Sequence, residues 1–390
     1  MKYILLITLL FCVARSYSQV IDPRVICSSN EVFVVEPDEL VRLKSSQTTY
    51  HIPIVFHVFD PSRPKDRLSV EKAQKVVDLL NANFSGKNRN INSVQPIFKS
   101  LIADCGIEFH LAKKDPYGNS IEGVTYHRKN MKGDNPGCNY SLKQEINWNT
   151  GSNFSGTQRY LQVWVTYNVN GQDNGSGWCY LPSSDKGGKV AGPTYNYKYL
   201  GDGDDSSSDD VLTHEIGHYF GLSHPFGESY DRCGDDGVDD TPETRCYAWL
   251  CKKGDLCNDG LVNTENFMDY SGCTSMFTKG QAKLMRYWLE KSYRKNLWSE
   301  KNLKYTGIYD ETVDDVGIYE QTLDVRIYPN PSNGVIYIKD LMVYTARLYD
   351  ISGKLVYETQ NENIVYGIRG VYVLKVISGG KLAIRKIIIN

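Results

Sequence analysis

The fold of this chain is decided by the stretch His214-Glu215-Ile216-Gly217-His218-Tyr219-Phe220-Gly221-Leu222-Ser223-His224. Residues four apart lie on one face of a helix, so His214 and His218 can present imidazole nitrogens to one ion. Glu215 lies one step round the helix, where it can take a proton from a metal-bound water. Gly221 permits a left-handed turn that brings His224 back as a third ligand. Three ligands with a fourth position open are typical of a catalytic zinc site.

The alternative interpretation of this stretch is a core helix whose histidines are buried and hydrogen-bonded. The chain has 7 His in 390 residues, so a chance H-E-x-x-H is expected roughly once in a hundred such sequences. Requiring a glycine and a third histidine at the next fixed positions lowers that chance to about one in 10⁵. The sequence therefore favours a metal site.

A methionine segment follows the histidines, at Asn266-Phe267-Met268-Asp269-Tyr270-Ser271-Gly272-Cys273. The extended histidine signature of metzincins requires a methionine turn beneath the zinc. We expect Met268 to form the hydrophobic floor under the three imidazoles. Tyr270 is then placed to reach the open side of the metal.

Taken together, these residues resemble the pappalysin family of metzincin metallopeptidases, over roughly residues 50–298. Ile52–Val58 is similar to the first strand of that family and Cys105–Ala112 to its second. The resemblance implies a domain of the α/β (α+β) class, with a mixed twisted sheet above the zinc helix. It also implies a Zn²⁺ cofactor and protein or peptide substrates.

Oxygen-bearing side chains gather after the zinc helix without the spacing of an EF-hand. Gly237–Pro242 is similar to the calcium-loop motif of the family, which implies a structural Ca²⁺. The ligands we expect are Asp239, Asp240 and Thr241.

The N-terminus predicts export. Met1-Lys2-Tyr3 precedes an apolar run at Ile4–Val13, which is too short to span a bilayer and suits a secretory signal peptide over residues 1–18. Ser16 and Ser18 are small residues that suit a cut before Gln19. No other segment approaches the length of a transmembrane helix.

Residues 19–48 have no clear periodicity, and we interpret them as a propeptide. The thiolate of Cys27 can occupy the open position of a zinc site and keep the enzyme latent until the propeptide is cut. The alternative is a structural or intermolecular cysteine.

The chain has 10 Cys, and an exported protein uses cysteines mainly for disulfides. Beyond the predicted signal peptide and propeptide, they are Cys105, Cys138, Cys179, Cys233, Cys246, Cys251, Cys257 and Cys273. The family resemblance implies interleaved pairs between the zinc helix and the methionine turn, one of them tying Cys273 to the loop. The spacing alone does not give the connectivity, and a cysteine-only zinc site is the competing interpretation.

Hydrophobic periodicity predicts the remaining elements of residues 49–298. We expect strands over Ile52–Phe59, Ile107–Ala112 and Leu161–Tyr167. Gly175–Pro182 falls where the resemblance places the antiparallel edge strand of the cleft. Helices are predicted from Ser69 to Gly86, around Phe98–Ile102, and from a capping box at Thr278 to about Tyr293.

Residues 299–322 lose this periodicity and predict a linker. From Leu323, short alternating strands between turn signals predict an all-β sandwich of about seven strands over residues 323–390. Tyr328-Pro329-Asn330-Pro331, Asp350–Lys354 and the basic-apolar ending resemble the C-terminal sorting domain of the type IX secretion system. This implies a secreted or cell-surface protein of a Gram-negative bacterium that engages that secretion machinery. A carbohydrate- or protein-binding module is the alternative.

The formal net charge of −2 gives no reason to expect nucleic acid as a partner. We expect a monomeric, exported zinc endopeptidase with Glu215 as general base. A non-peptidase zinc amidohydrolase and a catalytically silent adhesin remain alternatives. Some relatives prefer substrates with basic residues because they carry an acidic residue after the methionine turn. In this chain the corresponding residues are Ser271-Gly272, which are not acidic. Only Asp269 or a shifted loop would restore the preference for basic residues.

Overall fold

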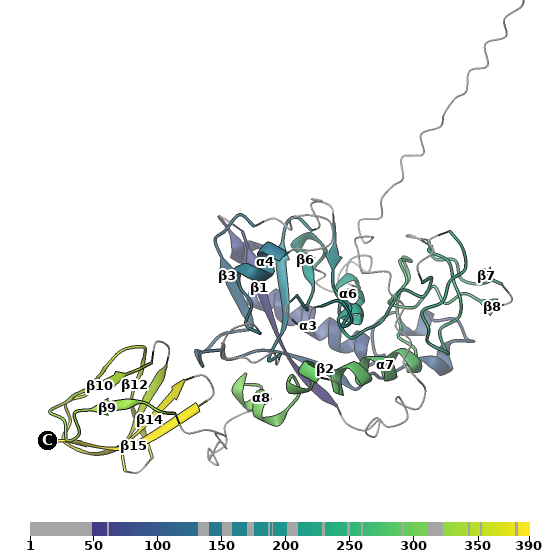
Figure 1. The fold of residues 1–390 in the computed structure, drawn as a ribbon. Helices are drawn as coiled ribbons and strands as arrows, with labels where there is room; N and C mark the ends of the chain where they lie inside the picture. The colour runs from purple at the N-terminus through teal and green to yellow at the C-terminus, as the bar shows by residue number, and fades with distance from the viewer. Residues whose placement is uncertain are drawn as a thin grey trace, which may run out of the picture.

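The computed structural model describes residues 49–390 except 61, 132–139, 150–157, 170–174, 186–187, 189, 201–209, 228–230, 248–249, 259, 291, 310–322, 342–343, 352 and 379–380. The predicted signal peptide, the predicted propeptide with Cys27, and Cys138 lie outside the described residues. The described chain forms two lobes, with the C-terminal strands in a lobe of their own (Figure 1).

Strand β1 (Tyr50–Phe59) is the centre of the larger lobe, and all of its residues except His51 are buried. Its first half pairs with β2 and its second half with β3, while β4 pairs along its other side, all in parallel. Strand β6 continues the sheet, and β5 closes it as an antiparallel edge. The bounds of these strands are β2 (Ile107–Leu111), β3 (Val124–His127), β4 (Leu161–Thr166), β5 (Gly177–Trp178) and β6 (Thr194–Asn196).

The predicted mixed sheet is therefore confirmed, and its antiparallel edge strand lies within the stretch that the sequence assigned to it. Valine, isoleucine and aromatic side chains form β1 because they fill both faces of a covered sheet.

Two helices of this lobe begin as their sequences predict. Ser69 caps α3 (Val70–Phe84) by accepting a hydrogen bond from the Lys72 amide at 3.1 Å. Helix α7 (Lys279–Glu290) opens with a reciprocal capping box, in which Gln281 Oε1 accepts from the Thr278 amide and Thr278 Oγ1 accepts from the Gln281 amide. The other helical segments are α2 (Pro64–Arg67), η1 (Ile91–Ser93), η2 (Lys99–Leu101), α4 (Tyr140–Glu145), η3 (Tyr197–Tyr199), α6 (Val211–Tyr219) and η4 (Ser292–Asn296).

The beginning of the predicted linker is instead a helix, α8 (Glu300–Tyr305). Leu303 is buried, and Ser299 caps the helix by accepting from the Asn302 amide at 3.2 Å. The Thr306 carbonyl accepts hydrogen bonds from the Lys113 and Lys114 amides, which attaches the segment to the chain that follows β2. Six residues are too few to show helical periodicity, which is why the sequence did not indicate this helix.

The C-terminal lobe is all-β, as predicted. Its strands form a three-stranded and a four-stranded sheet around a core that includes Ile336, Leu348, Leu374 and Ile387. The strands are β9 (Arg326–Tyr328), β10 (Val335–Lys339), β11 (Thr345–Tyr349), β12 (Leu355–Gln360), β13 (Ile364–Val365), β14 (Gly370–Ser378) and β15 (Lys381–Ile389).

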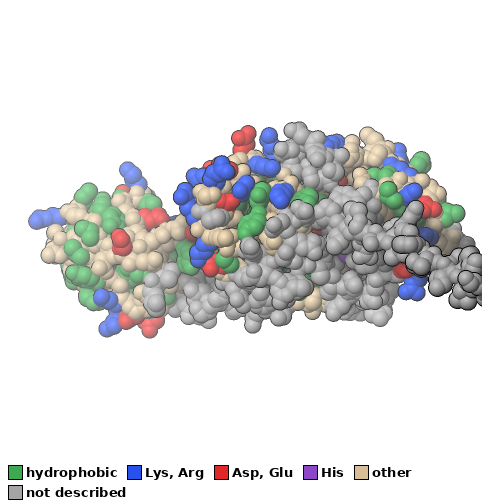
Figure 2. Space-filling model, turned by 90° about the horizontal axis from the view of Figure 1, so that it is seen from above, with side chains coloured by type: hydrophobic (Ala, Val, Ile, Leu, Met, Phe, Trp, Pro, Cys, Tyr) green, Lys and Arg blue, Asp and Glu red, His purple; other side chains and the backbone are tan. Residues whose placement is uncertain are grey.

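The surfaces of the lobes mix charged and apolar side chains. Figure 2 shows hydrophobic side chains at the surface of the C-terminal lobe, and Ile351, Val365 and Ile368 are among the exposed ones. None of the described helices combines the length and the apolar character that crossing a bilayer requires.

A buried ion pair supports the end of α6. Arg294 Nη2 donates to Asp185 Oδ2 at 2.7 Å, and both side chains are almost fully buried. The Arg294 guanidinium also lies 4.5 Å from the ring centroid of Tyr219, the last residue of α6. Removing one partner of such a pair leaves a buried charge uncompensated.

We therefore expect Arg294→Met to lower the free energy of unfolding of the larger lobe by about 3–5 kcal/mol. Lys304→Met is the control, because Lys304 pairs with Glu300 at an exposed i,i+4 position and should cost less than about 0.5 kcal/mol. Urea denaturation of both variants measures the difference, and equal losses would contradict the role given to the buried pair.

Candidate active site

Helix α6 carries the histidine motif and is buried along its whole length. It ends at Tyr219, and Gly221 follows with φ +94°, a left-handed conformation that side chains rarely adopt. A Cβ at Gly221 would also overlap the indole of Trp288. The short helix and its sharp exit bring His224 back beside the first two histidines.

The three imidazoles converge on one point. His218 Nε2 lies 3.0 Å from His214 Nε2 and 3.1 Å from His224 Nε2. His214 Nδ1 donates to the Phe267 carbonyl at 2.8 Å, and His218 Nδ1 donates to the Leu222 carbonyl at 2.7 Å. These bonds leave the Nε2 lone pairs directed at the shared point, which is the arrangement of metal-binding histidines.

Burial also holds the imidazoles in the form that binds metal. It lowers the pKa of His218 to about 4. The pKa of His224 falls well below its usual range, first through burial and then through the neighbouring histidines. Neutral, converging and buried nitrogens fit a zinc ion.

The methionine turn lies under this group. Met268 is fully buried, and Asn266 Oδ1 accepts from the Met268 amide at 2.9 Å. Gly217, on the facing side of α6, has no room for a Cβ because Met268 Sδ occupies that space. The methionine therefore packs directly against the backbone of the histidine helix.

Tyr270 flanks the histidines. Its ring centroid lies 4.7 Å from that of His224 and 5.4 Å from that of His214. Phe226 stacks on His224, with the centroids 4.8 Å apart and the planes at 9°, and its ring also lies 5.1 Å from that of Tyr270. Aromatic rings thus hold His224 in place, although it lies outside the helix.

Glu215 is 3% exposed and faces the antiparallel edge strand. A Cβ at Gly177 of β5 would lie 2.8 Å from Glu215 Cγ, so the strand backbone approaches the carboxylate closely. Burial raises the pKa of Glu215 well above its usual range, while the charge of Lys143 acts in the opposite direction. A carboxyl group with a raised pKa beside the histidines is suited to proton transfer.

A small pocket opens between the start of α6 and the methionine turn. It is lined by Asp210, Val211, His214, Phe267, Asp269, Tyr270 and Thr274. Two of these residues, Asp210 and Asp269, bear carboxylates, so the lining of this pocket next to the histidines is acidic.

Comparisons with known proteins agree with this geometry. A family model described as pregnancy-associated plasma protein-A matches residues 147–290. An extracellular metalloprotease of Podospora anserina is 30% identical over 218 residues, covering 53% of this chain and 67% of the relative. The chain belongs to the pappalysin family of metalloproteases. An extracellular metalloprotease of Arthroderma benhamiae is 34% identical over 121 residues, so the chain spans only 41% of that relative.

Solved structures show the same pappalysin fold. Mature mirolysin of Tannerella forsythia in complex with a cleaved peptide has a TM-score of 0.55 and 25% identity, covering 67% of this chain and 99% of mirolysin. A variant of promirolysin from the same organism has a TM-score of 0.56 and 25% identity, covering 69% and 90% of the two chains. The protein is thus a zinc metallopeptidase by family.

The C-terminal lobe matches a second family model. The secretion system C-terminal sorting domain covers residues 326–390. This confirms the predicted type IX sorting domain and indicates export to the cell surface or the extracellular space.

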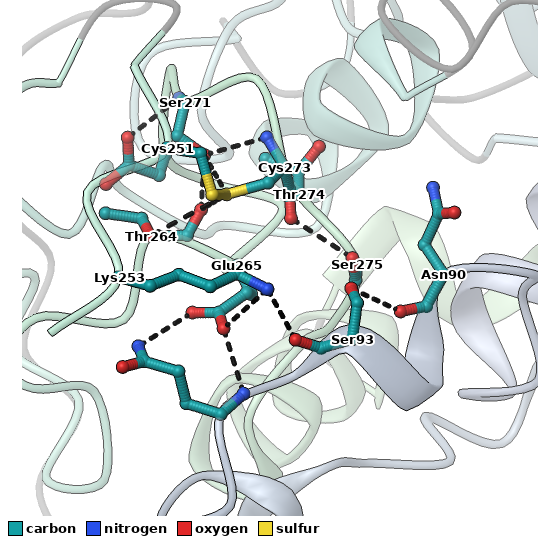
Figure 3. Close-up of a disulfide and its surroundings, with 12 residues drawn as sticks. Asn90, Ser93, Cys251, Lys253, Thr264, Glu265, Ser271, Cys273, Thr274 and Ser275 are labelled. Atoms are coloured by element: carbon teal, nitrogen blue, oxygen red, sulfur yellow. Dashed lines mark hydrogen bonds and ion pairs between the residues drawn. A yellow bond between two sulfur atoms is a disulfide. The ribbon is translucent and has the colours of Figure 1, made fainter.

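Among the residues that the structure describes, two disulfides cross-link the loop between α6 and α7. Cys233 pairs with Cys257, next to the small sheet of β7 (Leu256–Cys257) and β8 (Gly260–Leu261), and Cys251 pairs with Cys273. The pairs interleave, and the second ties down the segment after the methionine turn, as the family resemblance implied. Figure 3 shows Lys253 and the buried Glu265 beside this second disulfide, 3.5 Å apart.

Not every cysteine follows the disulfide prediction. Cys105 and Cys179 are fully buried thiols, and burial raises the pKa of Cys179 to about 12. Both pack among core side chains of the larger lobe, where a small apolar residue is needed and an oxidised partner is not.

The predicted calcium ligands lie apart from the histidines. Asp240 Oδ2 accepts from the Gly280 amide at the start of α7 at 2.8 Å, and Thr241 Oγ1 lies 3.5 Å from Thr278 Oγ1. Asp239 is exposed. Among the residues that the structure describes, no three carboxylates of this loop come close enough to share one ion through their side chains, and calcium stays a prediction.

Sequence reasoning missed four residues that shape the site. Gly177 and Gly217 leave space that Glu215 and Met268 need. A single sequence does not show which residue will pack against a glycine. Phe226 and Lys143 reach the site only through tertiary packing. The glycine inside the histidine motif was the one available signal, since glycine in a helix interior usually has a packing reason.

The exit glycine gives a stability prediction. Gly221→Ala should cost about 1–2 kcal/mol for the left-handed backbone and about 1–3 kcal/mol more for the overlap with Trp288. Gly254→Ala is the matched control, because Gly254 also has a positive φ but no atom within 4 Å of the added Cβ. Thermal unfolding with zinc content compares the two, and Gly254→Ala alone should keep full zinc content.

Proposed function

We propose that this pappalysin is an exported zinc endopeptidase in which His214, His218 and His224 hold the metal and Glu215 is the general base. The observation that carries the proposal is the convergence of three buried Nε2 atoms next to a buried carboxylate and the antiparallel edge strand. When bound, Zn²⁺ supplies a Lewis acid that activates water and polarises the scissile carbonyl.

The chain's own residues perform the proton transfers. Glu215 accepts a proton from the attacking water and passes it to the leaving amine. Its raised pKa favours the first step, because a carboxylate with a higher pKa is a stronger base. Tyr270, whose ring lies against His214 and His224, donates a hydrogen bond to the developing oxyanion.

Edge strand β5 positions the substrate. Among the described strands, Gly177 and Trp178 pair with β6 alone, so an extended peptide can add to the sheet through its backbone. Because Gly177 lies against Glu215, a strand bound there would carry its peptide bond past the general base. This arrangement favours a peptidase over a small-molecule amidohydrolase.

The proposal also covers export, activation, domain boundaries, calcium binding and oligomeric state. Residues 1–18 direct export and residues 19–48 form a propeptide in which Cys27 blocks the metal. The enzyme occupies residues 49–298, and residues 323–390 engage the secretion machinery. Asp239, Asp240 and Thr241 contribute to a structural calcium site. The mature enzyme is a monomer.

Glu215→Gln tests the general base. We expect the variant to retain its zinc and lose about 10²–10⁴-fold in peptide hydrolysis, because the carboxylate acts in the reaction and not in coordination. His218→Ala is the comparison and should lose both zinc and activity. Cleavage of a peptide library, with zinc measured on the same samples, separates the two. An active Glu215→Gln enzyme, or an enzyme active in a chelator, would refute the mechanism.

The pocket suggests a preference for a basic side chain next to the scissile bond. Asp269 Oδ1 accepts from the Ser271 amide at 2.9 Å, and Asp210 Oδ2 accepts from Thr274 Oγ1 at 2.9 Å. Both carboxylates lie outside the Tyr270–Cys273 segment, in which this chain has no acidic residue.

Asp269→Asn keeps the hydrogen bond to Ser271 and removes the charge. We expect it to lower kcat/KM for peptides with Lys or Arg in the pocket by about 10-fold, since one charge-assisted contact contributes about 1.5–3 kcal/mol. Peptides with Ala there should be cut at an unchanged rate. Asp104→Asn, on an exposed turn, is the control, and a uniform loss on all peptides would contradict this role of the pocket.

A further inference from the structure

A second group of potential metal ligands lies on the sheet, away from the histidine triad. His51, Glu108 and His110, here called the strand cluster, each offer a ligand atom within 4.8 Å of the others. Among the described residues, this cluster and the triad are the two such groups that contain histidine. The proposed peptidase mechanism uses none of its three residues.

Strand register brings the cluster together. His51 of β1 pairs directly with Glu108 of β2, and His110 follows Glu108 by two residues, so Glu108 and His110 point to the same face of the strand. The neighbours of these residues along the two strands, Ile52, Ile107 and Phe109, face the opposite way and are buried in the core. The cluster is thus fixed by the backbone of two paired strands.

The distances within the cluster resemble those of the triad. His51 Nδ1 lies 2.9 Å from His110 Nε2. The two oxygens of Glu108 divide between the rings, with Oε2 3.5 Å from His51 Nδ1 and Oε1 3.5 Å from His110 Nε2. The Nε2 atoms of the triad lie 3.0 and 3.1 Å apart. Both groups therefore need only small movements to bind an ion at ordinary bond lengths of about 2.0–2.2 Å.

The surroundings leave the cluster accessible. The side chains of His51, Glu108 and His110 are 28%, 45% and 30% exposed. The ring of Tyr309 packs against His51 with centroids 5.8 Å apart and limits its rotation.

We propose that His51, Glu108 and His110 bind a second Zn²⁺ ion, with water in the remaining positions. Two imidazoles and one carboxylate form a donor set that zinc commonly uses. The ion would join β1 to β2 at the start of the larger lobe and stabilise their pairing. Because Glu108 is itself a ligand here, the cluster has no separate general base and its role is structural.

The test is the zinc stoichiometry of the full chain. The purified protein is equilibrated with Zn²⁺ by dialysis and titrated calorimetrically, alongside His110→Gln, Glu108→Gln and a control, His127→Gln. His127 is a half-buried histidine of β3 on the same sheet that lies outside the cluster.

We expect two zinc ions per chain in the wild type and in His127→Gln, and one in each cluster variant. The cluster variants should lose the zinc-dependent rise in Tm that the wild type shows, while peptidase activity stays unchanged. One zinc per chain in the wild type, or two in both cluster variants, would overturn the proposal. Because Glu108 is the most exposed of the three, Glu108→Gln provides the test if His110→Gln does not fold.

Discussion

The abrupt end of helix α6 is the constraint on which the rest of the structure depends. A longer helix would carry His224 along its axis and away from His214 and His218. The chain turns because Gly221 adopts a positive φ, and Trp288 occupies the space that a side chain at this position would need, so only glycine fits. The glycine at position 221 therefore allows the three imidazoles to meet.

The imidazoles are then held by groups outside the motif. The carbonyls of Phe267 and Leu222 select the tautomers of His214 and His218, Met268 packs against Gly217, and the rings of Tyr270 and Phe226 pack against His224. The Cys251–Cys273 disulfide anchors the segment that supplies Tyr270. Burial lowers the pKa of His218 and His224 and raises the pKa of Glu215, so packing and electrostatics have the same origin.

Many of these features could be predicted from local sequence patterns. The histidine spacing, the capping box at Thr278, the strands around Ile52 and the seven short C-terminal strands follow from periodicity and turn chemistry. Contacts between distant segments could not be predicted, because they depend on tertiary neighbours. Examples are the contact of Gly177 with Glu215, the packing of Arg294 on Tyr219, and the buried thiols of Cys105 and Cys179. Helix α8 was missed because it is too short to show a period. The family resemblance, and not the spacing, gave the interleaved disulfides.

The central claim is that one zinc ion lies at the meeting point of His214, His218 and His224. Anomalous diffraction from crystals of the active enzyme, measured on both sides of the zinc absorption edge, tests it most directly. The account predicts a strong zinc peak at bonding distance from all three Nε2 atoms. Fully active crystals with no peak there, or with His224 turned away from the ion, would contradict it.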